Sequence, residues 1–192
     1  MTGKVVVNRC VSIDGFIAGP GDSMDFGGGL ALSDLVDPQD LAEIASATGA
    51  MLVGRRTWEV GARMAAERPD STDYPFEGPM FLLSHRPLDP PAPAVTILEG
   101  DIRAAVATAL AAAGDRDLEI LGADVARQCF EQGLVDEVLV YALPILLGGG
   151  TRFAAPRTVL EPVSSARSDR TTILRFRVAR TAAGRTAPAS GG

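Results

Sequence analysis

The sequence contains few of the residues that build metal centres and disulfides. It has two cysteines and one histidine in 192 residues, and Cys10 and Cys129 are far apart along the chain. Neither cysteine belongs to a CxxC pair, and the lone His85 cannot complete a zinc site with them. We therefore expect no metal, and two reduced thiols in a core strand and a core helix of a cytoplasmic protein.

Aromatic residues and positive charge are also scarce. Aromatics make up 5% of the chain, too few for a base-stacking platform, and the net charge is -6 with a pI near 4.8. A nucleic acid needs a basic surface, so the composition excludes it as a partner. The apolar run after Lys4 is too short to span a membrane or to act as a secretion signal. Any phosphate site must therefore be formed by a few residues in one place, not by an extended basic surface.

Hydrophobic residues make up 46% of the chain, enough for one well-cored domain. Strand and helix patterns alternate along it, and Asp37-Pro38 is typical of a helix start that Gly49 would end. We expect strands over 4–11, 50–53, 80–83, 95–98, 118–121, 135–143 and 171–180, and helices over 38–48, 57–68, 102–113 and 125–132. This order predicts an α/β fold with a mixed, mostly parallel sheet, helices on both faces and an antiparallel C-terminal strand. Residues 1–180 form the domain, and 181–192 read as a disordered tail.

The chemistry of such sheets lies where strands end. The first such junction is the apolar run 50–53 followed by Gly54, Arg55, Arg56 and Thr57. A helix N-terminus, free backbone N–H groups and two guanidinium groups all favour a phosphate there. Taken alone, the same residues are equally consistent with a glycine turn and solvated arginines.

Two further strand ends have polar residues suited to anions. Ser84-His85-Arg86 follows the strand over 80–83 and suits a phosphate monoester such as the 2′-phosphate of NADPH, although a plain polar strand end fits it too. The stretch 122–125 opens the next helix, and Gly122 lets the backbone approach a pyrophosphate. This stretch lacks the GxGxxG fingerprint of dinucleotide-binding folds.

The fourth junction follows the first strand, within a glycine-rich loop expected over 14–29. Asp14-Gly15 and then Ile17-Ala18 are consistent either with a loop folded over a flat ligand or with a simple turn. The glycines at 148–150 lack the lysine and the following helix of a P-loop, so we expect a flexible or close-packed turn there.

Together the junctions resemble the dihydrofolate reductase superfamily. The resemblance covers about residues 4–180 and rests on SIDGFIA, LVGRRTWE, LLSHR and ILGADVARQCFEQGLVDEVLVYALPILLGGGTRF with their spacing. The last of these motifs is most similar to a branch of the superfamily, the C-terminal reductase domain of riboflavin-biosynthesis enzymes, here in stand-alone form. No HxE…CxxC zinc signature of a deaminase accompanies it.

The resemblance implies a three-layer α/β/α fold and NADPH as cofactor. By matching positions, Ile17 and Ala18 contact the nicotinamide. The residues implied for the phosphates are Gly54, Arg55, Arg56 and Thr57, then Ser84 and Arg86 for the adenosine phosphate, and Gly122, Ala123, Asp124 and Val125 for the pyrophosphate. The implied activity is hydride transfer to a C=N bond of a pteridine or of a ribosylaminouracil-type substrate, as in 5-amino-6-(5-phosphoribosylamino)uracil reductase.

Three residues are expected to line the substrate pocket: Asp14, Asp25 and Phe26, the last where the branch usually has tryptophan. Asp40 stands where folate reductases carry a carboxylate on the first helix, but it is also an ordinary first-turn acid. The relatives imply a homodimer, for which the apolar run 138–147 offers either an interface or core. The alternative function is a non-catalytic protein that binds NADPH or another small ligand.

Overall fold

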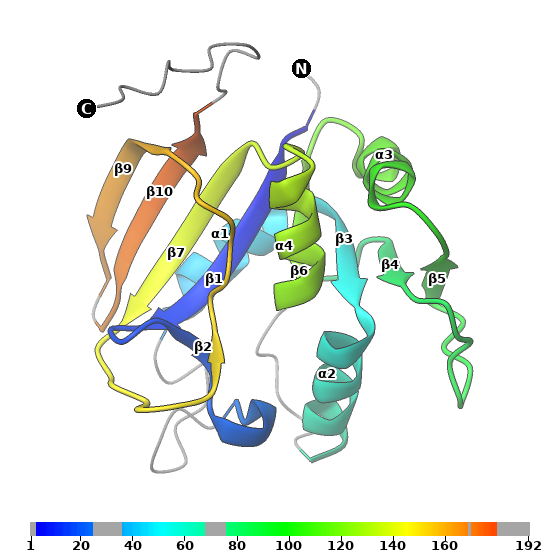
Figure 1. Cartoon of the computed structure of the whole chain (residues 1–192), viewed down its shortest axis with the longest axis horizontal. Coiled ribbons are helices and arrows are strands. Elements are labelled where there is room, and N and C mark those ends of the chain that lie inside the picture. The colour runs from blue at the N-terminus through cyan, green and yellow to red at the C-terminus, as the bar shows by residue number, and fades with distance from the viewer. Residues whose placement is uncertain (1–2, 25–35, 68–75, 169, 180–192) are drawn as a thin grey trace, which may run out of the picture.

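One large twisted sheet runs through the protein (Figure 1). The computed structural model describes residues 3–24, 36–67, 76–168 and 170–179. The sheet has eight strands in the order β5-β4-β3-β6-β1-β7-β10-β9. These strands are β1 (Val5–Ser12), β3 (Thr48–Gly54), β4 (Met80–Leu83), β5 (Val95–Leu98), β6 (Asp117–Leu121), β7 (Glu137–Leu143), β9 (Leu160–Arg167) and β10 (Thr172–Val178). All neighbours from β5 to β7 are parallel, and β10 pairs antiparallel with both β7 and β9. The mixed, mostly parallel sheet is confirmed.

Helices cover both faces of this sheet, which gives the three layers expected. The helices are α1 (Pro38–Ala47), α2 (Arg55–Glu67), α3 (Ile102–Ala113) and α4 (Ala123–Glu131), with a short 3-10 helix η1 (Pro20–Asp22). In Figure 1, α1 lies behind the sheet, whereas α3 and α4 lie in front of it. None of the helices in the described ranges is long and apolar enough to cross a membrane.

The core divides into two apolar clusters, one on each face of the sheet. Side chains of β1 alternate between them: Val5 and Val7 pack with α3 and α4, whereas Val6 packs with Leu41 of α1. Because both faces are covered, most residues of the central strands are buried, and Leu52 and Leu118 have no exposed surface. Continuous apolar runs were the correct signal for these strands.

Several boundaries differ from the prediction. Helix α2 starts at Arg55 and α4 at Ala123, both immediately after a strand-ending glycine. Gly49 does not end α1, because the chain is already extended at Thr48 and Gly49 lies within β3. A Cβ at Gly49 would lie 2.3 Å from the carbonyl oxygen of Ala113, so the close approach of α3 requires glycine there.

Four short or exposed elements escaped the sequence prediction. β2 (Phe16–Ala18) and β8 (Thr151–Arg152) form a small antiparallel sheet of their own, and η1 follows β2 inside the expected glycine-rich loop. All three are too short to show a period. Strand β9 was missed because every residue in it is exposed, so it carries no alternation of apolar and polar residues.

The apolar run 138–147 is mainly core. Strand β7 lies between β1 and β10, and Val138 and Leu143 are fully buried within the chain. Leu146, after the strand, is exposed. Both cysteines are free thiols, Cys129 in the core of α4 and Cys10 partly exposed on β1. The expected tail over 181–192 lies outside the described residues.

Asp14 joins two loops that are far apart in sequence. Its carboxylate accepts hydrogen bonds from the Ser12 hydroxyl at 2.6 Å and from the backbone N–H groups of Leu147 and Gly148 at 3.1 and 2.7 Å. These hydrogen bonds, that of Ser12 first, lower the pKa of Asp14 to about 2. Nearby, Gly150 has a φ of 124°, and a Cβ there would lie 2.1 Å from the Ala18 carbonyl oxygen. The glycine turn is therefore close-packed at Gly150, whereas a Cβ at Gly148 would lie in open space.

We predict that Asp14→Asn lowers the thermal unfolding midpoint at pH 7, because an amide accepts these three hydrogen bonds less well than a carboxylate. The native pKa lies below the unfolded value, so the carboxylate stabilises the fold above about pH 4 and this contribution is lost as the pH falls towards about 2. The gap between wild type and variant, followed by circular dichroism, should narrow over that range.

Asp101→Asn is the matched control for this measurement. Asp101 precedes α3 and makes no capping hydrogen bond through its side chain, and asparagine is an equally good N-cap residue. Equal midpoints for wild type and Asp14→Asn at pH 7 would show that the Asp14 carboxylate does not join the two loops.

Candidate functional site

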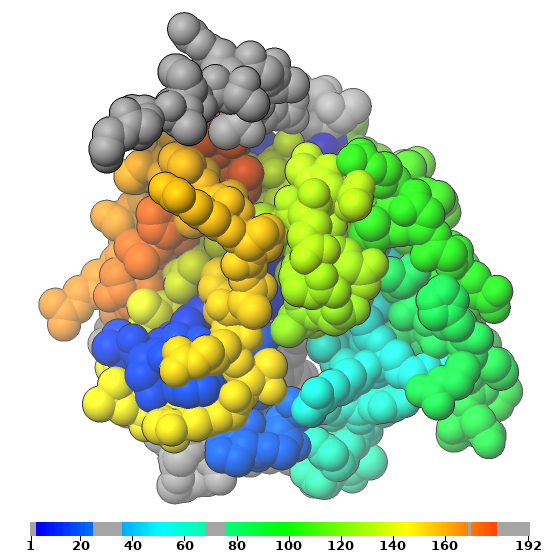
Figure 2. Space-filling view, in the orientation of Figure 1, coloured from blue at the N-terminus to red at the C-terminus, as the bar shows by residue number. Residues whose placement is uncertain are grey.

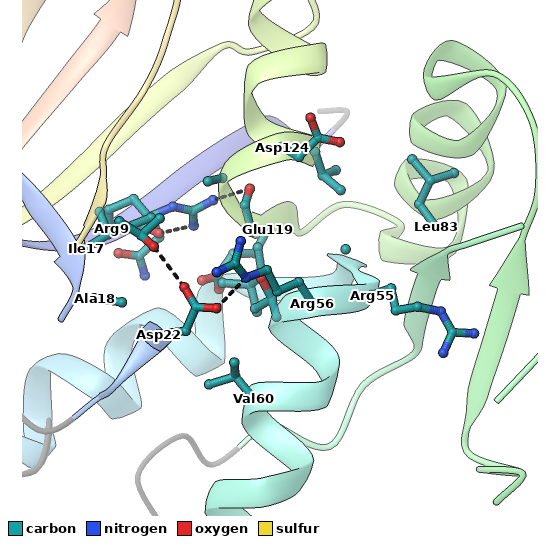
Figure 3. A pocket seen from close by; sticks show the side chains of 18 of the residues that line it. Arg9, Ile17, Ala18, Asp22, Arg55, Arg56, Val60, Leu83, Glu119 and Asp124 are labelled. Atoms are coloured by element: carbon teal, nitrogen blue, oxygen red, sulfur yellow. Dashed lines mark hydrogen bonds and ion pairs between the residues drawn. The ribbon is translucent and has the colours of Figure 1, made fainter. Parts of the chain in front are cut away.

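A cavity of about 630 Å³ opens at the carboxyl ends of β1, β3, β4 and β6. Figure 3 shows side chains from these strands, from the β2 region and from α2 and α4 directed around one space. Residues from all four predicted junctions line it: Ile17, Ala18, Gly54, Arg55, Arg56, Thr57, Ser84, His85, Arg86, Gly122, Ala123, Asp124 and Val125. Topology has thus gathered segments spread over more than half of the chain into one site.

The first and third junctions lie directly against each other. Because β3 and β6 are neighbouring parallel strands, the helices that follow them, α2 and α4, begin side by side. A Cβ at Gly122 would lie 2.7 Å from the Thr57 hydroxyl oxygen, and one at Gly54 would lie 3.0 Å from Val125 Cγ2. Gly122 also has a φ of 100°. The positive φ of Gly122 favours glycine there, whereas a side chain at position 54 would require the Val125 side chain to shift. Two helix N-termini lie at one wall of the cavity.

Arg55 connects the first junction to the second. Its Nε donates to the Ser84 hydroxyl at 2.9 Å, and its Nη2 donates to the carbonyls of Arg86 and Pro87. Its Nη1 forms an exposed ion pair with the Glu59 carboxylate at 3.3 Å. The Ser84 hydroxyl also accepts from the Arg86 backbone N–H. Arg55 therefore holds the loop after β4 in place as well as lining the cavity.

Arg56 points the other way, towards the segment after β2. It forms an ion pair with Asp22, whose other carboxylate oxygen accepts from the Thr151 hydroxyl at 2.8 Å (Figure 3). Burial opposes ionisation of Asp22, but the hydrogen bonds from Thr151 and Arg56 outweigh it and lower the pKa. In the space-filling view, η1 adjoins α2 at this point (Figure 2). The Asp22–Arg56 pair bridges the two sides of the cavity.

The remaining cofactor predictions fall on the cavity wall. Ala18 is buried and Ile17 half-buried, both beside the cavity. Asp124 lies in the first turn of α4, where its carboxylate accepts from Arg127 at 2.6 Å and Gln128 at 2.8 Å. The hydrogen bond from Arg127 is the main cause of its lowered pKa. The Asp124 carboxylate is thus hydrogen-bonded to two side chains of its own helix.

The residues predicted to line the substrate pocket differ in their positions from the predicted cofactor residues. Asp14 is not among the residues that line the cavity, and its carboxylate is engaged in joining two loops. Asp25 and Phe26 lie outside the described residues.

Sequence reasoning missed a buried charged pair of strand residues beside the cavity. Arg9 on β1 is 6% exposed and Glu119 on β6 is 3% exposed, and both line the site. The guanidinium of Arg9 donates to the carbonyls of Ile120 at 2.9 Å and Gly122 at 3.0 Å. Burial lowers its pKa to about 10, which leaves it charged at pH 7. The sequence carried a signal for both residues, because each is a charged residue inside a buried strand: Arg9 in VVVNRCV and Glu119 in LEIL.

The far end of the cavity, under α1, combines apolar and polar groups. Tyr141 and Cys10 line it, and burial raises the pKa of both, that of Cys10 to about 12. The charge of Asp40 also raises the pKa of Tyr141, which places the first turn of α1 close to this end. Oδ2 of Asp40 is buried and has no hydrogen-bond partner among the described residues. Within those residues, no cluster of histidine, cysteine and acidic side chains could hold a metal ion.

Comparison with solved structures supports the fold. A putative riboflavin biosynthesis protein from Shewanella sp. PV-4 is 23% identical with a TM-score of 0.74, over 92% of this chain and 99% of that one. A bifunctional diaminohydroxyphosphoribosylaminopyrimidine deaminase/5-amino-6-(5-phosphoribosylamino)uracil reductase from Thermotoga maritima is 16% identical with a TM-score of 0.62. The match covers 93% of this chain but 57% of that one.

Dihydrofolate reductase from Enterococcus faecalis, solved as a complex with NADP(H) and RAB-propyl, also has this fold. It is 18% identical with a TM-score of 0.59, over 93% of this chain and 98% of that one. The fold is therefore dihydrofolate reductase-like. No curated protein matches the chain. The family model described as the RibD C-terminal domain matches residues 3–175, and the chain accordingly belongs to the RibD C-terminal domain family.

Proposed function

We propose that this chain is an NADPH-dependent reductase that transfers a hydride to a C=N bond of a pteridine or ribosylaminouracil-type heterocycle. The observation that carries the proposal is the contact between the β3–α2 and β6–α4 junctions. It sets two helix N-termini and Arg56 at one wall of a single cavity. This wall matches a pyrophosphate, and the cavity is large enough for more than one ring system.

The residues present fit NADPH. Gly54 and Gly122 let the starts of α2 and α4 lie against each other, so the first N–H groups of both helices could donate to one phosphate group. Arg56 lies at the same wall, and Ser84, His85 and Arg86 line the cavity one strand further along, where they would hold an adenosine phosphate. Ile17 and Ala18 would contact the nicotinamide. When bound, NADPH supplies the hydride.

Arg55 and Asp14 act through other groups in this proposal. Arg55 positions Ser84 and the carbonyls of residues 86 and 87, so its contribution to phosphate binding is partly indirect. Asp14 positions the loop that carries Ile17 and Ala18 rather than binding substrate. Asp22 holds Arg56 in the free protein, and a bound phosphate would compete with it for that guanidinium.

Protonation of the substrate nitrogen needs an acid near the far end of the cavity. Asp40 is the candidate, because its Oδ2 is buried without a partner in the described part of the chain and its charge is felt at Tyr141, which lines the cavity. A carboxyl group within hydrogen-bond reach of the substrate nitrogen can act as the general acid.

A non-catalytic ligand-binding protein remains the second candidate for a site of this kind. It would bind NADPH equally well but oxidise it with no heterocycle, which separates it from a reductase.

We also propose that the chain is a homodimer. Strand β9 offers a surface for self-association, since it is an exposed edge strand with Leu160 and Val163 at the surface.

We predict that wild type binds NADPH in preference to NADH, and that Arg55→Ala/Ser84→Ala removes most of this preference. Both side chains organise the proposed 2′-phosphate site, and a charge-assisted hydrogen bond contributes about 1.5–3 kcal/mol, or roughly tenfold or more in affinity. Fluorescence titration with both cofactors measures the effect. Arg103→Ala, on α3 and hydrogen-bonded to Gln132, is the control and should leave both affinities unchanged. An equal affinity of wild type for the two cofactors would contradict the assignment.

We predict that Asp40→Asn lowers kcat by about 100-fold, the usual range for a general acid, while NADPH affinity stays at the wild-type value. An amide cannot deliver a proton, and the residue lies outside the phosphate wall. Stopped-flow measurement of NADPH oxidation tests this with any substrate that turns over. Asp37→Asn, the N-cap of the same helix, is the matched control, because asparagine also caps. Full activity of Asp40→Asn would assign the proton to water.

A further inference from the structure

Two neutral polar side chains line the far end of the cavity and take no part in the proposed cofactor site. Asn8 on β1 is 9% exposed and Tyr141 on β7 is 3% exposed. Asn8 accepts a hydrogen bond from Arg9 through its backbone carbonyl only. Within the described part of the chain, neither the Asn8 amide nor the Tyr141 hydroxyl has a hydrogen-bond partner. Buried polar groups are normally paired, so these two are groups that a ligand would satisfy.

The polar atoms of both side chains reach the cavity. Thr171 Oγ1 is fully enclosed by protein and lacks a hydrogen-bond partner among the described residues, whereas no polar atom of Asn8 or Tyr141 is in that state. Because Asn8 and Tyr141 line the cavity, the small exposed area of each lies on the cavity wall. A molecule in the cavity can therefore contact both groups.

Strand register places the two groups close together. Asn8 lies opposite Leu139 on the parallel strand β7, and Tyr141, two residues further along β7, lies opposite Cys10. Side chains alternate along a strand, so Asn8 shares a face with Val6 and Cys10. Both of those pack in the apolar cluster under α1, as does Tyr141. Asn8 and Tyr141 are thus diagonal neighbours on the sheet face that α1 covers.

Helix α1 adds an apolar wall beside these groups. Its residues Leu41 and Ile44 pack on this face of the sheet and line the cavity. Glu119 lines the cavity too, but its carboxylate accepts from the Thr48 hydroxyl at 3.2 Å and its charge favours the charged form of Arg9. A flat ring can therefore lie against apolar side chains with its polar edge directed at Asn8 and Tyr141.

The chemistry of the two groups selects one kind of ring edge. A carboxamide has N–H donors beside a carbonyl acceptor, so it can form two parallel hydrogen bonds with a ring N–H that stands next to a ring C=O. This lactam edge is common to oxopteridines and aminouracils. Burial raises the pKa of Tyr141, so its phenol stays protonated at neutral pH and can donate to a further ring acceptor.

We propose that Asn8 recognises the lactam edge of the substrate ring and that Tyr141 donates to a second acceptor on the same ring. The inference rests on the proposed reductase function and adds the group by which its substrate is selected. A ring that is alkylated at the lactam nitrogen would leave the Asn8 carbonyl unpaired, and the site would reject it.

The experiment uses 1-methyluracil and 1,3-dimethyluracil as matched probes, because only the first has a lactam N–H. Nuclear magnetic resonance titration of the nitrogen-15-labelled full chain, free and saturated with NADPH, follows the side-chain amide signal of Asn8. Loss of this signal in Asn8→Ala and in Asn8→Ser assigns it. In wild type, 1-methyluracil should shift the signal and bind about fivefold or more tightly than the dimethyl compound. Both variants should bring this ratio to about one.

Two further variants test the specificity of the effect. Tyr141→Phe should weaken both probes by the same factor, because a phenol that donates to a ring acceptor does not read the lactam N–H. Thr171→Val is the matched control, because Thr171 is a buried hydroxyl residue that is not among those lining the cavity. It should leave both affinities unchanged. Thermal unfolding followed by circular dichroism checks that each variant is folded.

The outcomes separate this proposal from the proposed function. Equal affinities of wild type for the two probes, or no shift of the Asn8 signal with 1-methyluracil, would overturn the lactam assignment. A loss of NADPH affinity in Asn8→Ala with an unchanged probe ratio would also overturn it, and would assign the amide to the nicotinamide carboxamide. Failure of wild type to bind NADPH, measured by fluorescence, would instead overturn the proposed function, and titration of the free protein would still test Asn8.

Discussion

The site depends on one contact, that between the strand-ending glycines of β3 and β6. These two strands are parallel neighbours, so the chain leaves both at the same edge and enters α2 and α4 at the same level. Gly122 lies against Thr57, and Gly54 lies against Val125. A side chain at Gly122 would meet the Thr57 hydroxyl and push the two helix starts apart. Without this contact the cavity would lose the wall that we assign to phosphates, and Arg56 would lie beside an ordinary loop.

The arginines around this wall form hydrogen bonds and ion pairs with different segments of the chain. Arg55 faces the loop after β4 and fixes Ser84, whereas Arg56 faces η1 and pairs with Asp22. Arg9, buried on β1, donates to the carbonyl of Gly122 itself and thereby ties the first strand to the start of α4. Three guanidinium groups thus hold three different segments in place. Glu119 of β6 is buried like Arg9, lines the same cavity, and its charge favours the charged form of Arg9.

Much of this was predictable from local patterns. Runs such as 50–53 and 118–121 are apolar without alternation because both faces of the sheet are covered, and the strands were found for that reason. Two of the four junctions, at Gly54 and Gly122, were found because glycine followed by a helix start has a direct physical meaning. The strands that were missed are stabilised by pairing rather than by a pattern in their own sequence. β2 pairs only with β8, and β9 pairs only with β10. Arg9 and Glu119 were not predicted as site residues, although each lines the cavity.

The sequence alone determined the class of the fold and picked out the strand ends that line the cavity, because these follow from local spacing and composition. Tertiary structure decided which of those places meet. Asp14 joins two loops and is not among the residues that line the cavity, and Arg55 is largely engaged with a loop, because both have partners that lie far away in the chain. Hydrogen-bond partners contributed by distant segments are set only when the sheet order is known. That order, with β6 inserted between β1 and β3, places the glycine junctions side by side.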